Sequence, residues 1–125
     1  MNKYILCIID IDIFRIYYYS NNILRRIDLF MERNFDKGDV VKHFKRETIS
    51  EEQLKENPKL YLYEIIGIAR HTENKEEVVV YKPLYPTEVM NGVDFVVRPL
   101  EMFMSEVERD KYPNISQKYR FELYK

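Results

Sequence analysis

The sequence predicts a mainly β domain that folds as a small barrel or a rolled sheet. Three observations favour this class. Several short apolar or alternating segments are separated by turn residues. Only one segment, which follows Ser50, carries its own helix start signal, so helices cannot cover both faces of a parallel sheet. The length of 125 residues, 46% of them hydrophobic, fits one globular domain.

The first predicted elements are a turn, a strand and a short helix. Residues 35–39 form the turn, in which Gly38 can adopt a positive φ. Residues 40–45 read as a strand. Ser50 and Gln53 are spaced as a capping box, which predicts a helix over residues 51–56. Asn57 and Pro58 then end that helix.

The strongest strand prediction covers residues 60–70. Their alternation places Tyr61, Tyr63 and Ile65 on one face and Leu62, Glu64 and Ile66 on the other. Gly67 predicts a bulge in this strand. Residues 77–82 form the next strand, and the short connection predicts an antiparallel hairpin. The apolar run that includes Val80 indicates burial on both faces, so Val80→Asp is expected to unfold the domain.

The last predicted elements are a strand over residues 94–98, a helical turn after Pro99 and a closing strand over residues 119–124. The helical turn carries an apolar stripe that is expected to plug the open end of a barrel. The stripe consists of Leu100, Met102, Phe103 and Met104.

Residues 1–30 differ from the rest of the chain. They are rich in Ile, Tyr and Asn and contain no Glu, Gly or Pro. We therefore predict that they are an N-terminal extension from a misassigned start, that Met31 is the natural start, and that residues 31–125 form a single small β-barrel domain. Asp10 and Asp12 follow an apolar strand and could hold Mg²⁺. A half-buried strand is favoured instead, because no Gly-rich phosphate loop follows.

Composition argues against several function classes. Twenty basic and 21 acidic residues argue against nucleic-acid binding through bulk charge. A single cysteine permits no internal disulfide, and two histidines argue against a zinc site, so we predict no cofactor and no metal. Residues 4–9 are too short an apolar run for a membrane span or a signal peptide, which predicts a cytoplasmic protein without a membrane partner.

Four motifs in series resemble a bacterial family of small proteins with a domain of unknown function. The family pattern reads H-F-K, then A-x-H-[ST]-E, then V-V-Y-x-x-L-Y, then W-V-R-P-x-x-M-F. The matching segments here are residues 43–45, 69–73, 79–85 and 96–103, and the resemblance extends over roughly residues 38–123. Val96 replaces a frequent tryptophan, Pro86 replaces a frequent glycine, and residues 46–58 are an insertion found in a longer subgroup.

The resemblance implies a small SH3-like, partly open β-barrel, here with one short inserted helix and a short turn of helix after Pro99. It implies no reaction. We expect candidate ligand-binding side chains at strand ends and turns, where cations and aromatic groups can cradle an anion or stack a base. These are Arg98, His71, Arg70, His43 and Tyr81. The alternative is structural: Arg98 pairs with Glu73 or Glu101, and His71 bonds a turn carbonyl.

Two classes of function remain open. The first is a binding module for a peptide, a protein or a nucleic acid, without its own catalysis, since no credible nucleophile or metal cluster is present. The second is a small enzyme or sensor for an anionic metabolite such as a nucleotide, which would use His43, His71 and Arg98. A cleft that joins both histidines to Arg98 favours the second class, whereas a flat aromatic or basic face favours the first.

Overall fold

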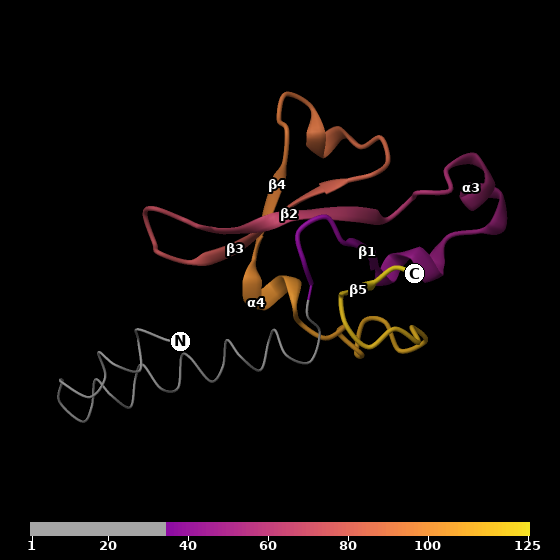
Figure 1. Cartoon of the computed structure of the whole chain (residues 1–125). Helices are drawn as coiled ribbons and strands as arrows, with labels where there is room; N and C mark the ends of the chain where they lie inside the picture. Colours follow the sequence, from indigo (N-terminus) through magenta and orange to yellow (C-terminus); the bar gives the residue numbers. More distant parts are fainter. Residues whose placement is uncertain (1–34) are drawn as a thin grey trace. The chain divides into compact units, whose positions relative to one another are not determined.

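A computed structural model describes residues 35–125 (Figure 1). In this part of the chain five strands form one antiparallel sheet in the order β4-β3-β2-β1-β5. The predictions on residues 1–30, on Met31 as the natural start and on Asp10 and Asp12 lie outside the described residues. Within residues 35–125 no helix has the length and apolar character needed to cross a membrane.

The elements follow the predicted order. The strands are β1 Val40–His43, β2 Leu62–Arg70, β3 Glu77–Pro83, β4 Val96–Pro99 and β5 Phe121–Leu123. The helical elements are the 3₁₀ helices η1 Phe44–Thr48 and η2 Glu88–Met90, and the α-helices α3 Glu51–Glu56 and α4 Leu100–Phe103. The predicted mainly β class is therefore confirmed.

The five strands do not close into a barrel, and the SH3-like part of the fold prediction stays a prediction. In the described part of the chain, the last strand β5 pairs only with β1, and β4 pairs only with β3. Both edges of the sheet thus stay separate. β5 is only three residues long, and the pairing observed for it uses the edge that faces β1.

The first strand ends earlier than predicted. β1 stops at His43 because the imidazole Nδ1 accepts a hydrogen bond from the backbone N–H of Lys45 at 3.1 Å. This side chain caps a 3₁₀ turn and draws residues 44 and 45 out of the extended conformation. Gly38 has the positive φ that the preceding turn was predicted to need.

The predicted capping box and bulge are both confirmed. The hydroxyl of Ser50 accepts a hydrogen bond from the Gln53 backbone N–H at 3.2 Å, and the Gln53 side chain accepts one from the Ser50 N–H at 3.0 Å. The register between β2 and β3 shifts between Ile65 and Gly67. β2 begins at Leu62 rather than at residue 60, because Tyr61 has a φ of +63°, which interrupts extended backbone.

The core lies between the sheet and α4, which packs against β3 and β4. The rings of Phe103 and Phe121 are stacked, with centroids 4.1 Å apart and planes 6° from parallel. Tyr81 and Tyr63 meet Phe121 edge-on. Only part of the predicted apolar stripe faces the core. Leu100, Phe103 and Met104 are buried, whereas Met102 is exposed.

The predicted hairpin of β2 and β3 is confirmed, but its most buried valine is not the one expected. Val79 is 2% exposed, whereas Val80 is only half-buried. Val97 on the neighbouring strand β4 is 59% exposed. Val79 is therefore the residue at which a charge should break the fold.

Val79→Asp is expected to unfold the domain, because an unpaired carboxylate in this core costs several kcal/mol. Val97→Asp is the matched control and should change the melting temperature by no more than a few degrees. Circular dichroism melts of both variants test this. Equal melting temperatures for Val79→Asp and the wild type would show that β3 is not a core strand.

Candidate functional site

A cleft of about 230 Å³ is formed where β1, β4 and the segment that leads into β5 come together. The end of β1 and the start of η1 form one wall of the cleft, and Arg98 of β4 forms a second. Side chains from residues 108–120 form the remaining wall. The lining side chains are His43, Phe44, Lys45, Arg98, Glu108, Lys111, Tyr112 and Arg120.

Positive charge dominates this cleft. Four of its side chains are cationic and one, Glu108, is a carboxylate. Glu108 is itself paired with Lys111, at 3.3 Å between carboxylate oxygen and ammonium nitrogen. Within residues 35–125 the remaining three cations form no salt bridge; they are Lys45, Arg98 and Arg120. The cleft therefore has an excess of positive charge that an anion would balance.

Arg98 is held at the cleft by neutral partners. Its Nε donates a hydrogen bond to the hydroxyl oxygen of Tyr81 at 3.1 Å. One terminal nitrogen lies 3.5 Å from the sulfur of Met102, and the guanidinium lies 5.8 Å from the ring centroid of Phe121. Among residues 35–125 no salt bridge joins Arg98 to Glu73 or Glu101, the two pairings that the structural alternative predicted.

Arg120 is the residue immediately before β5, and it lines the cleft. Its Nε donates a hydrogen bond to the Ser105 hydroxyl at 3.2 Å. Its backbone is fixed on both sides, because its N–H donates to the Ser105 carbonyl and its carbonyl accepts from the Phe44 N–H. Both arginines thus have their Nε occupied by a hydroxyl group, which fixes the direction of each guanidinium.

His43 is a buried, neutral wall of the cleft. Its ring packs 4.4 Å from Phe44 and 5.0 Å from Phe121, centroid to centroid. Burial, together with the charges of Arg120, Arg98 and Lys45, lowers the pKa of His43 from 6.5 to about 3. Because Nδ1 accepts the Lys45 N–H, the neutral ring carries its proton on Nε2.

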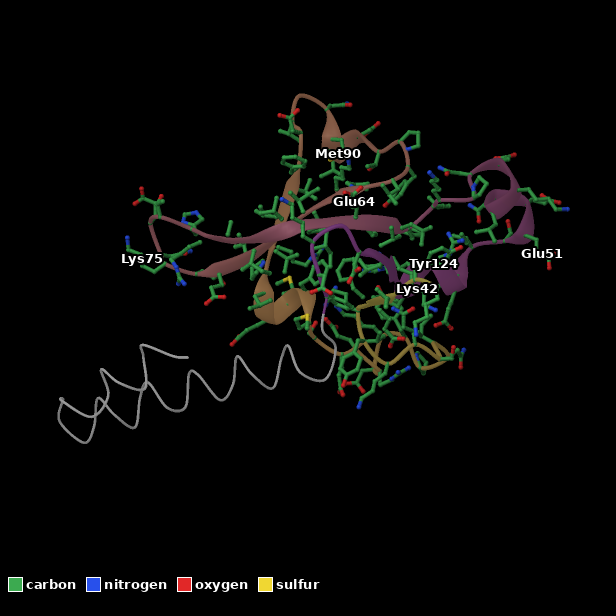
Figure 2. The ribbon with its side chains drawn as sticks, in the orientation of Figure 1. Lys42, Glu51, Glu64, Lys75, Met90 and Tyr124 are labelled. Atoms are coloured by element: carbon green, nitrogen blue, oxygen red, sulfur yellow. The ribbon has the colours of Figure 1, made fainter. Side chains whose placement is uncertain are left out.

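The structure divides the candidate residues that the sequence predicted. His43 and Arg98 line the cleft, and the Tyr81 hydroxyl accepts a hydrogen bond from Arg98. Arg70 and His71 do not line it. They lie at the end of the β2–β3 hairpin next to Lys75, which Figure 2 shows at the opposite end of the sheet from Tyr124.

Both hairpin-end residues stabilise the turn. Arg70 forms a salt bridge with Glu77 at 3.5 Å and donates a hydrogen bond to the Lys75 carbonyl at 3.0 Å. The Nδ1 of His71 accepts the backbone N–H of Glu73 at 3.2 Å, so the ring bonds a turn amide rather than a turn carbonyl.

Several cleft residues were not predicted from sequence. Lys111, Tyr112 and Arg120 come from the C-terminal segment, most of which has no regular secondary structure and so gives no periodic signal. This segment is tied to η1 by Glu47, whose carboxylate accepts the backbone N–H groups of Ser116 and Gln117 at 2.9 and 2.7 Å. Arg120 and Lys45 did have a usable signal, since each is a cation next to an aromatic core residue.

The cleft offers hydrogen-bond donors rather than metal ligands. In the described part of the chain, no group of His, Cys, Asp and Glu side chains could hold a metal ion. The cleft is lined by two guanidinium groups, by the ammonium groups of Lys45 and Lys111, and by the His43 ring. Such donors favour an oxyanion such as phosphate or carboxylate.

Comparison with known proteins gives one match. The model of a family described as "Protein of unknown function (DUF1653)" matches residues 39–123. The matched range includes His43, Arg98 and Arg120. It does not include residues 1–38. No curated protein and no solved structure matches the chain.

The lowered pKa of His43 predicts a loss of stability in mild acid. Between about pH 6.5 and about pH 3 the unfolded chain binds a proton at this residue that the folded protein does not. The free energy of unfolding should therefore decrease as pH falls through this window, at a rate of up to about 1.4 kcal/mol for each pH unit from this residue alone. Urea unfolding at a series of pH values measures it.

Other groups also titrate in this range, so His43→Phe serves as the reference. This variant keeps an aromatic ring in the core and should show a shallower decrease in stability below about pH 6.5. An imidazole proton resonance of His43 that titrates with a midpoint near 6.5 in the folded protein would contradict the prediction.

Proposed function

The chain belongs to the family of proteins of unknown function DUF1653, and we propose that its domain is a binding module that recognises an anionic group and has no catalysis of its own. The observation that carries this proposal is the cleft, in which Lys45, Arg98 and Arg120 form no salt bridge with the residues that the structure describes. The partner is a peptide, a protein or a nucleic acid that presents such a group.

The state of His43 supports binding rather than catalysis. A general base needs a free lone pair and a pKa near the working pH. The Nδ1 of His43 already accepts a backbone N–H, and its Nε2 carries the proton. With a pKa of about 3, the ring also remains neutral and does not act as a general acid near neutral pH. It is therefore suited to donate a hydrogen bond from a fixed position.

A sensor for an anionic metabolite is the second candidate, and one observation favours it. The charged groups lie in a cleft rather than on a flat face, and a cleft encloses a small ligand better than a peptide. Of the residues expected for this class, His43 and Arg98 are present in the cleft, whereas His71 is not.

We also infer that the fold is an opened relative of the SH3-like barrel. The support is the strand order, in which four strands form a meander and the last strand β5 returns to pair with β1. This inference concerns the topology of the fold and does not affect the cleft.

The proposal predicts that inorganic phosphate binds at the cleft. Titration followed by ¹H–¹⁵N NMR should shift the backbone amides of Phe44, Lys45 and Arg120 more than those of the β2–β3 hairpin end. Arg98→Ala should weaken binding about tenfold, because a charge-assisted hydrogen bond is lost. Its melting temperature should stay within a few degrees of the wild type.

Arg70→Ala provides the comparison, since this arginine also bonds neighbouring groups but lies at the hairpin end. It should leave phosphate binding unchanged. Equal losses of affinity in Arg70→Ala and Arg98→Ala would show general charge attraction instead of a site. If Arg98→Ala unfolds the protein, Arg98 is part of the scaffold and the site assignment is wrong.

A further inference from the structure

We propose that the cleft is a receptor for a doubly charged tetrahedral oxyanion, specifically the phosphoryl group of a phosphomonoester or of free phosphate, and that it discriminates against carboxylates and phosphodiesters. This inference rests on the proposed function, namely that the cleft binds an anion. It adds the chemical class of the ligand.

The first argument is the amount of charge. Lys111 and Glu108 neutralise each other, which leaves the charges of Lys45, Arg98 and Arg120. A carboxylate or a phosphodiester brings one negative charge and leaves two cations uncompensated. A phosphomonoester brings between about 1.5 and 2 negative charges at neutral pH, so it balances more of the cleft's charge.

The second argument is the number and direction of the donors. Arg98 and Arg120 each have their Nε engaged by a hydroxyl oxygen, of Tyr81 and Ser105 respectively. One terminal nitrogen of Arg98 contacts the Met102 sulfur, so its other terminal nitrogen and those of Arg120 serve the ligand. The fixed guanidinium planes lose little freedom when they bind it. A phosphoryl group has three terminal oxygens for two arginines and a further donor, whereas a carboxylate has only two.

The further donor is the Nε2–H of His43. Because His43 is buried and capped at Nδ1, its ring cannot turn to offer a lone pair without losing the bond to the Lys45 N–H. Burial and the cations Arg120, Arg98 and Lys45 keep the ring neutral when the cleft is empty. The ion pair of Glu108 and Lys111 also lines the cleft, and the rings of Phe44, Tyr61 and Phe121 lie beside the imidazole.

The third argument is size. A cleft of about 230 Å³ is smaller than the ~300–1,000 Å³ typical of sites that enclose a whole drug-sized ligand. It can enclose a phosphoryl head group, and the rest of a larger ligand would extend out of it. The inference therefore concerns the head group and not the molecule that carries it.

The experiment compares the affinities of four small probes at neutral pH and constant ionic strength. Methyl phosphate and inorganic phosphate carry the proposed group, dimethyl phosphate is the singly charged diester, and acetate is the carboxylate. Titrations followed by NMR at the amides of Lys45 and Arg120 give each dissociation constant. Lys55→Ala, on the remote helix α3, is the control for general charge.

We expect methyl phosphate to bind at least about tenfold more tightly than dimethyl phosphate or acetate. Arg120→Gln should reduce this preference, and Lys55→Ala should not.

If acetate binds as tightly as methyl phosphate and Arg98→Ala weakens both, the cleft binds anions but the phosphoryl assignment is wrong. If none of the probes shifts the cleft amides, both the phosphoryl assignment and the proposed anion-binding function are wrong. Tighter binding of methyl phosphate than of inorganic phosphate would assign the ester as the ligand, and the reverse order would assign the free ion.

A pH series tests the role of the neutral imidazole. Methyl phosphate gains its second charge near pH 6, so its affinity should rise between about pH 5 and pH 7.5. Sulfate has the same shape and a fixed double charge, so its affinity should stay constant over this range. Tighter sulfate binding at the lower pH would show that a cleft group, His43 first of all, gains a proton with the ligand, which would overturn the neutral-donor role.

His43→Phe completes the test, because it removes the Nε2–H and keeps an aromatic ring against Phe44. Its affinity for methyl phosphate should fall about tenfold with an unchanged pH profile. If His43→Phe does not fold, the sulfate series on the wild-type protein decides the question alone.

Discussion

The stack of Phe103 on Phe121 is the contact on which the rest of the structure depends. Phe103 lies on α4 and Phe121 on β5, and both rings are almost fully buried. The stack anchors the closing strand, whose three residues make few backbone hydrogen bonds of their own. Because β5 is fixed there, the preceding residue, Arg120, reaches the same cleft as Arg98, whose guanidinium lies over the Phe121 ring. The core and the candidate site are thus built on one pair of rings.

His43 connects this core to the cleft. Its imidazole ends β1, caps η1, packs against Phe121 and lines the cleft. A buried ring beside three cations must be neutral, and that neutrality lowers the stability of the protein in acid. The same burial gives the cleft a donor that does not change with pH near neutrality. The stability cost and the proposed binding role therefore have one physical cause.

The positive cleft shows why total charge is a poor guide to local electrostatics. The chain has a net charge of only −1, yet three cations meet in the cleft without forming a salt bridge with any of the described residues. They come from η1, β4 and the residue before β5. Glu47 draws the C-terminal segment onto η1 and so completes the lining. The proposed anion would replace the carboxylates that these cations lack.

The sequence by itself determined the local structure of this protein. The capping box of Ser50, the bulge at Gly67, the helical turn after Pro99 and the hairpin of β2 and β3 were all predictable, because each depends on residues only a few positions apart. The mainly β class followed from the same signals. Of the site, His43, Tyr81 and Arg98 could be named in advance, since each belongs to a recognisable motif at a strand end.

Only the tertiary structure decided which of these residues meet. Arg70 and Arg98 looked alike in sequence, as cations at strand ends, but the register of the hairpin places Arg70 at its far end beside Glu77. Whether the sheet closed, and which cations surround His43, depended on β5 pairing with β1, across about 80 residues of chain. No local pattern encodes such a contact, because its free energy comes from burying distant aromatic rings together.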